Sequence, residues 1–165
     1  MDDFDARIQL LSVGRALAIL RHAESVAADR YRSLCERTDG PTLRTTFQEL
    51  ADLKEGNLQR VEKCLHDRYP GSDFVLTAEE RELVTVGTLL PERSGPDALD
   101  EAIRILHQSE LRTGRFCASL REHTPDPSLK PLFNTMADEC ADHAGTLAGL
   151  LDRARTAVSA TADDS

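Results

Sequence analysis

Apolar residues recur along this chain at alternating steps of three and four, in four separate runs. Such spacing places each run on one stripe of an α-helix, the stripe that a helical bundle buries. The first two runs are Leu10, Val13, Leu17, Leu20, Glu24, Ala27, Tyr31 and Leu34, then Leu43, Phe47, Leu50, Lys54, Asn57, Val61 and Cys64. The last two are Leu99, Ile103, Leu106, Glu110, Thr113, Cys117 and Leu120, then Leu129, Phe133, Met136, Cys140, His143, Leu147 and Leu150. No stretch alternates with period two for long enough to predict a sheet.

The second pair of runs repeats the first pair at a fixed offset. Residues 24–34 align with 110–120, and residues 47–52 align with 133–138, both at an offset of 86 positions (110 − 24). The stretch that links each pair keeps the same offset, so that Pro41 aligns with Pro127. We therefore expect a duplicated helical hairpin. An unrelated hairpin dimer or a coiled coil would leave this shared offset unexplained.

Turn residues divide the chain into two hairpins and one long connection. Short Gly/Pro/Asp segments at 39–41 and 125–127 link the helices of each hairpin, with Thr42 and Ser128 expected as N-caps. The prediction is an all-α, antiparallel four-helix bundle over residues 1–156. Hairpin 1 covers about 6–68, the crossover 69–96 and hairpin 2 about 97–156, with a disordered tail at 157–165. Thr77 and Glu80 have capping-box spacing, which predicts a short helix inside the crossover.

Polar residues interrupt the apolar stripe at the same height in all four predicted helices. A polar side chain in a core costs several kcal/mol unless it is paired or bound to a metal. A layer of such residues therefore marks the functional centre. Its members are Glu24, Lys54, Asn57, Glu110, Thr113, Cys140 and His143.

These residues carry a resemblance to a known family. In the first helix of each hairpin a glutamate precedes an aromatic residue by about two turns, as Glu24 precedes Tyr31 and Glu110 precedes Phe116. The second helices share the pattern Phe-x-x-Leu/Met-Ala-Asp at 47–52 and 133–138. Over about residues 8–155, apart from the crossover, the chain resembles the rubrerythrin branch of the ferritin-like superfamily. The resemblance implies a ferritin-like bundle, two iron ions and an oxidase or peroxidase activity.

The resemblance also implies which residues bind the iron ions. In the family each hairpin supplies a glutamate from its first helix and a Glu-x-x-His from its second. The matching residues are Glu24, Glu110 and His143. The substituted ligand positions are Lys54 and Asn57, where the first Glu-x-x-His is expected, and Cys140, where the second glutamate is expected. Glu55 and Glu139 each lie one residue from the inward face, about 100° around the helix, and whether either rotates into the site stays open.

Charge counting favours a centre without metal. Glu24 and Glu110 contribute two negative charges, and Lys54 with a protonated His143 would cancel them. We therefore expect Lys54 to bridge the two glutamates and His143 to hydrogen-bond to Glu110. This interpretation predicts no cofactor, and a non-catalytic scaffold or partner-binding protein. Tyr31 is interpreted as a core residue with a satisfied hydroxyl, rather than as a radical or proton-donor tyrosine.

The alternative is a metal site that uses half of the family's ligands. Glu110, His143 and Cys140, with Glu24 reaching across, combine carboxylate, imidazole and thiolate donors, which suit one Fe or Zn ion. By its resemblance such a protein would be an active oxidoreductase of iron or peroxide metabolism.

Composition limits the partners and the compartment. The net charge of −9 disfavours binding to nucleic acid or to an anionic membrane. No apolar stretch approaches the roughly 20 residues that span a bilayer, and the acidic N-terminus lacks the features of a signal peptide. We therefore expect a cytoplasmic protein. In that reducing compartment the four widely spaced cysteines, which include no C-x-x-C pair, argue against disulfides and against a rubredoxin-type iron site. The resemblance favours a homodimer formed through exposed helix faces, and the sequence identifies no protein partner.

Overall fold

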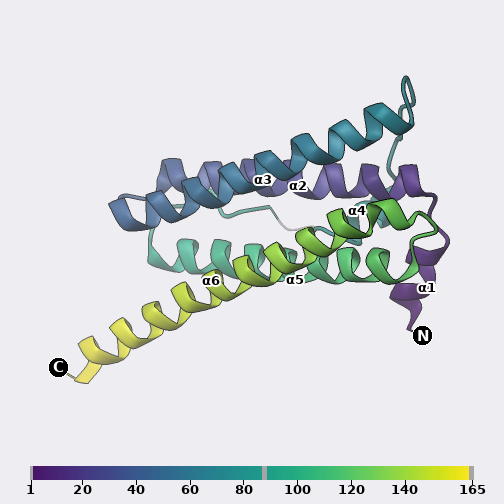
Figure 1. The fold of residues 1–165 in the computed structure, drawn as a ribbon. Coiled ribbons are helices and arrows are strands. Elements are labelled where there is room, and N and C mark those ends of the chain that lie inside the picture. The colour runs from purple at the N-terminus through teal and green to yellow at the C-terminus, as the bar shows by residue number, and fades with distance from the viewer. Residues whose placement is uncertain (1, 87–88, 164–165) are drawn as a thin grey trace.

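The computed structural model describes residues 2–86 and 89–163, and within them it is helical with no strand. Four long helices form the bundle: α2 (Val13–Arg37), α3 (Pro41–Arg68), α5 (Pro96–His123) and α6 (Lys130–Asp163). Helix α2 pairs with α3 and α5 pairs with α6, while the connection between the pairs runs along the bundle (Figure 1). The predicted all-α bundle of two hairpins is confirmed.

The N-terminal segment differs from the prediction. Residues 3–9 form a separate helix, α1 (Asp3–Gln9), and the Ser12 side chain then caps α2 by accepting a hydrogen bond from the Arg15 N–H at 3.2 Å. The placement of Leu10 in the buried stripe is wrong, because this break leaves it 87% exposed. Ile8 occupies the core instead.

The two hairpin turns use different caps from those that the sequence suggested. Gly40 is the N-cap residue of α3, and Pro41 is its first residue, a position where the missing N–H of proline costs nothing. In the second hairpin a 3-10 turn, η1 (Pro127–Leu129), precedes α6, and Asp126 accepts a hydrogen bond from the Ser128 N–H at 3.0 Å. The predictions of Thr42 and Ser128 as N-caps are therefore wrong.

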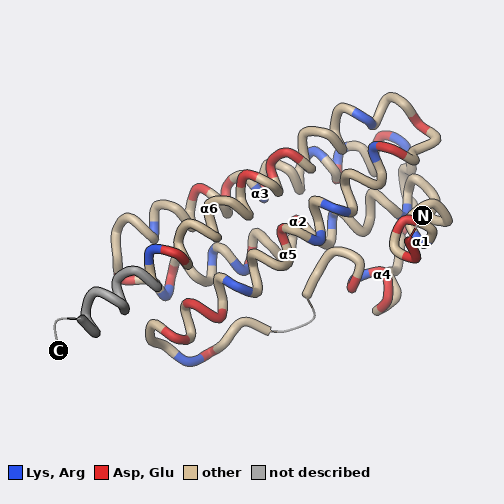
Figure 2. The backbone as a smooth tube through the Cα atoms, turned by 90° about the horizontal axis from the view of Figure 1, so that it is seen from below, with Lys and Arg blue, Asp and Glu red and all other residues tan. Residues whose placement is uncertain are grey.

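The crossover contains the predicted short helix, α4 (Ala78–Glu82). Thr77 caps it by accepting a hydrogen bond from the Glu80 N–H at 3.1 Å. Helix α4 contacts α2 near the end of the bundle that carries α1 (Figure 2).

The C-terminal helix is longer than expected. Helix α6 continues to Asp163, whereas the sequence predicts a disordered tail from residue 157. Alanines at 154, 157, 160 and 162 favour the helical backbone. Residues 164–165 of the predicted tail lie outside the described residues.

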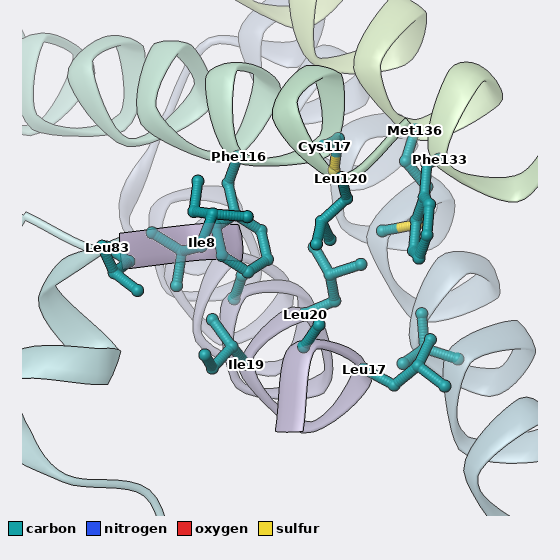
Figure 3. Packing of buried hydrophobic residues seen from close by; sticks show 14 of the residues in the cluster. Ile8, Leu17, Ile19, Leu20, Leu83, Phe116, Cys117, Leu120, Phe133 and Met136 are labelled. Atoms are coloured by element: carbon teal, nitrogen blue, oxygen red, sulfur yellow. The ribbon is translucent and has the colours of Figure 1, made fainter. Parts of the chain in front are cut away.

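Two apolar clusters fill the bundle on either side of its polar layer. One cluster, shown in Figure 3, includes Leu17 and Leu20 of α2, Leu120 of α5 and Phe133 of α6. The other cluster is built from residues such as Tyr31, Phe47, Leu106 and Leu147. Charged residues of both signs are spread along the long helices (Figure 2). None of the described helices combines the length and apolar character needed to cross a membrane.

Candidate functional site

The polar layer brings one or more side chains from each long helix to the centre of the bundle. Glu24 comes from α2, Lys54 from α3, Glu110 from α5, and Cys140 and His143 from α6. Each of the five is at most 5% exposed. Of the residues singled out in the sequence, the structure brings these five together.

Lys54 lies between the two glutamates. Its Nζ atom is 2.9 Å from Glu110 Oε2 and 3.7 Å from Glu24 Oε2. Only the shorter of these distances is that of a hydrogen bond. The Cys140 sulfur is 3.9 Å from the same Nζ atom. The ammonium group is thus paired with both carboxylates, more tightly with that of α5.

Tyr31 completes the environment of Glu110. Its hydroxyl donates a hydrogen bond to Glu110 Oε1 at 2.8 Å, from a side chain that is fully buried. The sequence predicted a satisfied hydroxyl but did not identify its partner. One feature of the sequence indicated that Tyr31 lies close to the polar layer: it belongs to the same buried stripe of α2 as Glu24.

The predicted hydrogen bond from His143 to Glu110 is absent. His143 Nδ1 lies 3.7 Å from Glu110 Oε1, beyond hydrogen-bonding distance. Tyr31 occupies this side of the carboxylate instead. Among the described residues, neither His143 Nδ1 nor Glu24 Oε2 has a hydrogen-bond partner.

Asn57 belongs to a neighbouring group rather than to the centre. Its amide donates to Glu139 Oε2 at 2.6 Å, and Arg60 contacts both side chains. This contact joins α3 to α6 at the edge of the layer. Glu55 lies elsewhere, 3.4 Å from Arg32. Neither Glu55 nor Glu139 enters the layer in this structure.

The electrostatics of the layer follow from burial and from Lys54. Burial alone would lower the pKa of Lys54, but Glu24 and Glu110 outweigh it and raise that pKa, so the amine stays charged. Burial likewise opposes ionisation of Glu110, but the Lys54 charge prevails and lowers the Glu110 pKa to about 2. The pKa of Glu24 is raised by burial, which its more distant Lys54 partner offsets only in part. Burial also raises the pKa of the Cys140 thiol.

The crossover covers the layer on the side of α2 and α5. The Thr113 hydroxyl donates to the Val84 carbonyl at 3.2 Å, and Arg112 donates to the Glu82 carbonyl at 2.8 Å. Beneath this segment a cavity of about 10 Å³ reaches Lys54 and Glu110. That volume accommodates a single water molecule.

The donor set does not fit two iron ions. Within the described part of the chain, no group of three or more His, Cys, Asp or Glu side chains is arranged to hold a metal. Helix α3 supplies a charged ammonium and an amide that faces Glu139, in place of a carboxylate and an imidazole. A protonated lysine has no lone pair to donate, and its positive charge repels a divalent cation.

The contribution of Tyr31 can be measured by substitution. We expect Tyr31→Phe to lower the free energy of unfolding by about 1–3 kcal/mol, because one oxygen of the buried Glu110 loses its donor. Urea unfolding followed by circular dichroism measures this change. Tyr69→Phe alters the other tyrosine of the chain, which packs edge-on against Phe74, and provides the matched control. Equal effects of the two substitutions would contradict the assigned role.

Comparison with known proteins agrees with this architecture. A solved structure of a hypothetical protein from Pyrococcus furiosus superimposes with a TM-score of 0.76 at 21% identity, covering 88% of this chain and 92% of that one. This similarity concerns the fold alone. No curated protein matches the chain. The family model described as Rubrerythrin matches residues 17–151, which include all four long helices in whole or in large part. The chain therefore belongs to the rubrerythrin family.

Proposed function

We propose that this chain is a non-catalytic member of the rubrerythrin family, a scaffold or partner-binding protein whose central layer needs no metal. The observation that carries this proposal is the position of Lys54 Nζ, 2.9 Å from Glu110 and 3.7 Å from Glu24. A buried ammonium at these distances neutralises one of the two carboxylate charges that would otherwise attract a metal, and burial raises the pKa of Glu24, which disfavours the second charge. Its two carboxylate partners come from the first helix of each hairpin.

The loss of ligands from α3 supports a role other than oxidation. An oxidase or peroxidase centre requires a metal with an open coordination position. Here the positions that carry Glu-x-x-His in the family hold Lys54 and Asn57. What remains is a buried ionic layer joined to four helices, which fixes their relative arrangement. Such a rigid bundle suits a protein that works by presenting a surface.

Metal content tests the proposal directly. We expect protein purified without chelator to contain less than about a tenth of an equivalent of Fe, Zn or Mn. Inductively coupled plasma mass spectrometry measures this quantity, and incubation with Fe²⁺ or Zn²⁺ followed by desalting tests for a site that was merely empty. Thermal unfolding should be unchanged by added EDTA. A stoichiometric metal that resists desalting would overturn the proposal.

One observation favours the second candidate, an oxidoreductase with a mononuclear metal site. His143 Nδ1 is buried without a hydrogen-bond partner among the described residues, 3.7 Å from Glu110 Oε1. An imidazole nitrogen in that position suits a metal ligand, with Cys140 one turn away on α6. This candidate predicts about one equivalent of metal, lost in a His143→Ala variant and retained in a His123→Ala control at the exposed end of α5.

A further inference from the structure

A second concave site lies outside the bundle centre, between α2, α3 and the crossover. It is an open pocket of about 330 Å³, within the range of small-molecule sites. Helix α2 lines it with Arg21, His22 and Ser25, three residues on one helical face. The crossover contributes Phe74 and Arg81.

The pocket gathers positive charge. Within the described residues, the guanidinium groups of Arg21 and Arg81 have no ion-pair or hydrogen-bond partner. The pKa of His22 is lowered by burial and by the nearby charges of Arg81 and Arg30, so its imidazole is neutral near pH 7. Glu62 is the acidic residue that lines the pocket, and it leaves a net charge of about +1 (two arginines less one glutamate). This local excess of one positive charge contrasts with the net charge of −9 of the chain.

Neighbouring arginines hold the crossover in place, and this fixes the pocket. Arg15 lies 3.5 Å from Glu80 and donates to the Val75 carbonyl at 3.3 Å. Arg30 donates to the Val86 carbonyl at 3.2 Å. These contacts, with the Thr77 cap, anchor the segment that carries Arg81. Arg21 and Arg81 make no such contact and remain available to a ligand.

The wall of the pocket is apolar. Phe74 lies edge-on to Tyr69, with ring centroids 5.7 Å apart, and its ring packs so closely on Gly14 that a side chain there would collide with it. Leu58 and Leu76 extend this wall from α3 and the crossover. The pocket thus presents an ordered aromatic surface beside two guanidinium groups.

We propose that this pocket binds a small organic phosphate, with its phosphate group on Arg21 and Arg81 and its apolar body against Phe74. Guanidinium groups match phosphate oxygens with paired, charge-assisted hydrogen bonds. The Ser25 hydroxyl and the His22 N–H add donors on the same side. Together these groups offer more hydrogen-bond donors than a carboxylate can accept with its two oxygens, which favours a phosphate as the ligand. The site is separate from the Lys54 layer and does not depend on the function proposed above.

Phenyl phosphate is a suitable probe, since it combines a phosphate with an aromatic ring. We expect the full chain to bind it with a Kd of about 1 mM or tighter, given its small number of atoms. Isothermal titration calorimetry, supported by ligand-observed NMR, measures the affinity. Arg21→Gln and Arg81→Gln should each weaken binding about tenfold or more. Arg104→Gln, at an exposed position on α5 that lines no described pocket, should leave it unchanged.

Inorganic phosphate tests the role of the apolar wall. It should bind more weakly than phenyl phosphate, and Phe74→Leu should weaken only the binding of phenyl phosphate. Glutamine has good helix propensity and leucine keeps the apolar character of Phe74, so these variants should fold. Far-UV circular dichroism verifies this. The proposal is overturned if phenyl phosphate shows no saturable binding, if the Arg21 and Arg104 variants bind it equally, or if inorganic phosphate binds as tightly.

Discussion

Lys54→Ala is expected to lower the free energy of unfolding by about 3–5 kcal/mol. The substitution removes the cation that lies 2.9 Å from Glu110 and 3.7 Å from Glu24, and both carboxylates stay buried without it. Removing one partner of a buried ion pair costs far more than the pair contributes, because the remaining charge is left without solvent or counterion. Urea unfolding at neutral pH measures the loss.

The pH dependence of this loss identifies its origin. The Glu110 pKa in the folded protein is about 2, below its ordinary value of 4.5. A depressed folded pKa contributes stability that is present above the unfolded value and is lost as pH falls towards the folded value. The difference between wild type and Lys54→Ala should therefore be largest above about pH 4.5 and shrink as pH falls towards 2. The raised pKa of Glu24 has the opposite effect on stability: as pH falls, protonation of this group removes the cost of burying its charge.

Two controls separate charge from packing. Lys63→Ala removes a lysine of an exposed pair with Asp67 and should change stability little. The triple variant Lys54→Met, Glu24→Gln, Glu110→Gln replaces the whole ionic group with neutral side chains of similar size. It should recover most of the stability lost in Lys54→Ala, as neutral replacements of buried ion pairs do elsewhere. A wild-type-like Lys54→Ala variant would refute the assigned position of the lysine.

The double substitution Lys54→Glu with Asn57→His is expected to convert the layer into a metal site. It removes the buried positive charge and supplies a third carboxylate beside Glu24 and Glu110, so that a divalent cation becomes the means of neutralisation. Residues 54 and 57 are one turn apart on α3, and both are buried. We expect about one equivalent or more of Co²⁺ or Fe²⁺ to bind, with an increase in Tm of several degrees on adding metal in excess of its Kd.

Visible absorption of bound Co²⁺ and elemental analysis after desalting measure this gain. The control is Lys54→Met with Asn57→His, which removes the same charge but adds no carboxylate, and it should bind substantially less metal. In the wild type, Asn57 faces Glu139 rather than the centre, at 2.6 Å. Failure of the double variant to bind metal would show that α3 no longer directs this position towards the glutamates, and that the family's geometry has been lost along with its residues.

These experiments bear on different parts of the proposed function. Loss of stability in Lys54→Ala supports the ion pair as a structural element, whether or not the wild type binds a metal elsewhere. Metal binding by the double variant supports descent from a site with the family's geometry. The metal content of the wild type decides between the non-catalytic protein and the mononuclear oxidoreductase.

The sequence alone predicted the four long helices of the bundle, their pairing and the position of the polar layer, although not the exact ends of the helices. A step of three and four describes a helical stripe directly, since side-chain direction in a helix depends on local geometry. The 86-residue offset placed the glutamates of α2 and α5 at equal heights. The pairing of Lys54 with these two carboxylates also followed from the sequence, because a buried layer must come close to electrical neutrality.

Tertiary structure decided which polar groups touch one another. Tyr31 rather than His143 donates to Glu110, and Asn57 contacts Glu139, because helix rotation and rotamer choice select among neighbours that lie within a few ångströms. The chain breaks between α1 and α2 near Leu10 because the hydrogen bond from the Arg15 N–H to the Ser12 side chain starts a new helix there, in place of one continuous helix. Nothing in the sequence indicated the pocket that contains Arg21 and Arg81, because the two arginines are 60 positions apart in the chain (81 − 21). Only the packing of the crossover on α2 brings them to one site, since long-range contacts depend on the whole fold rather than on local spacing.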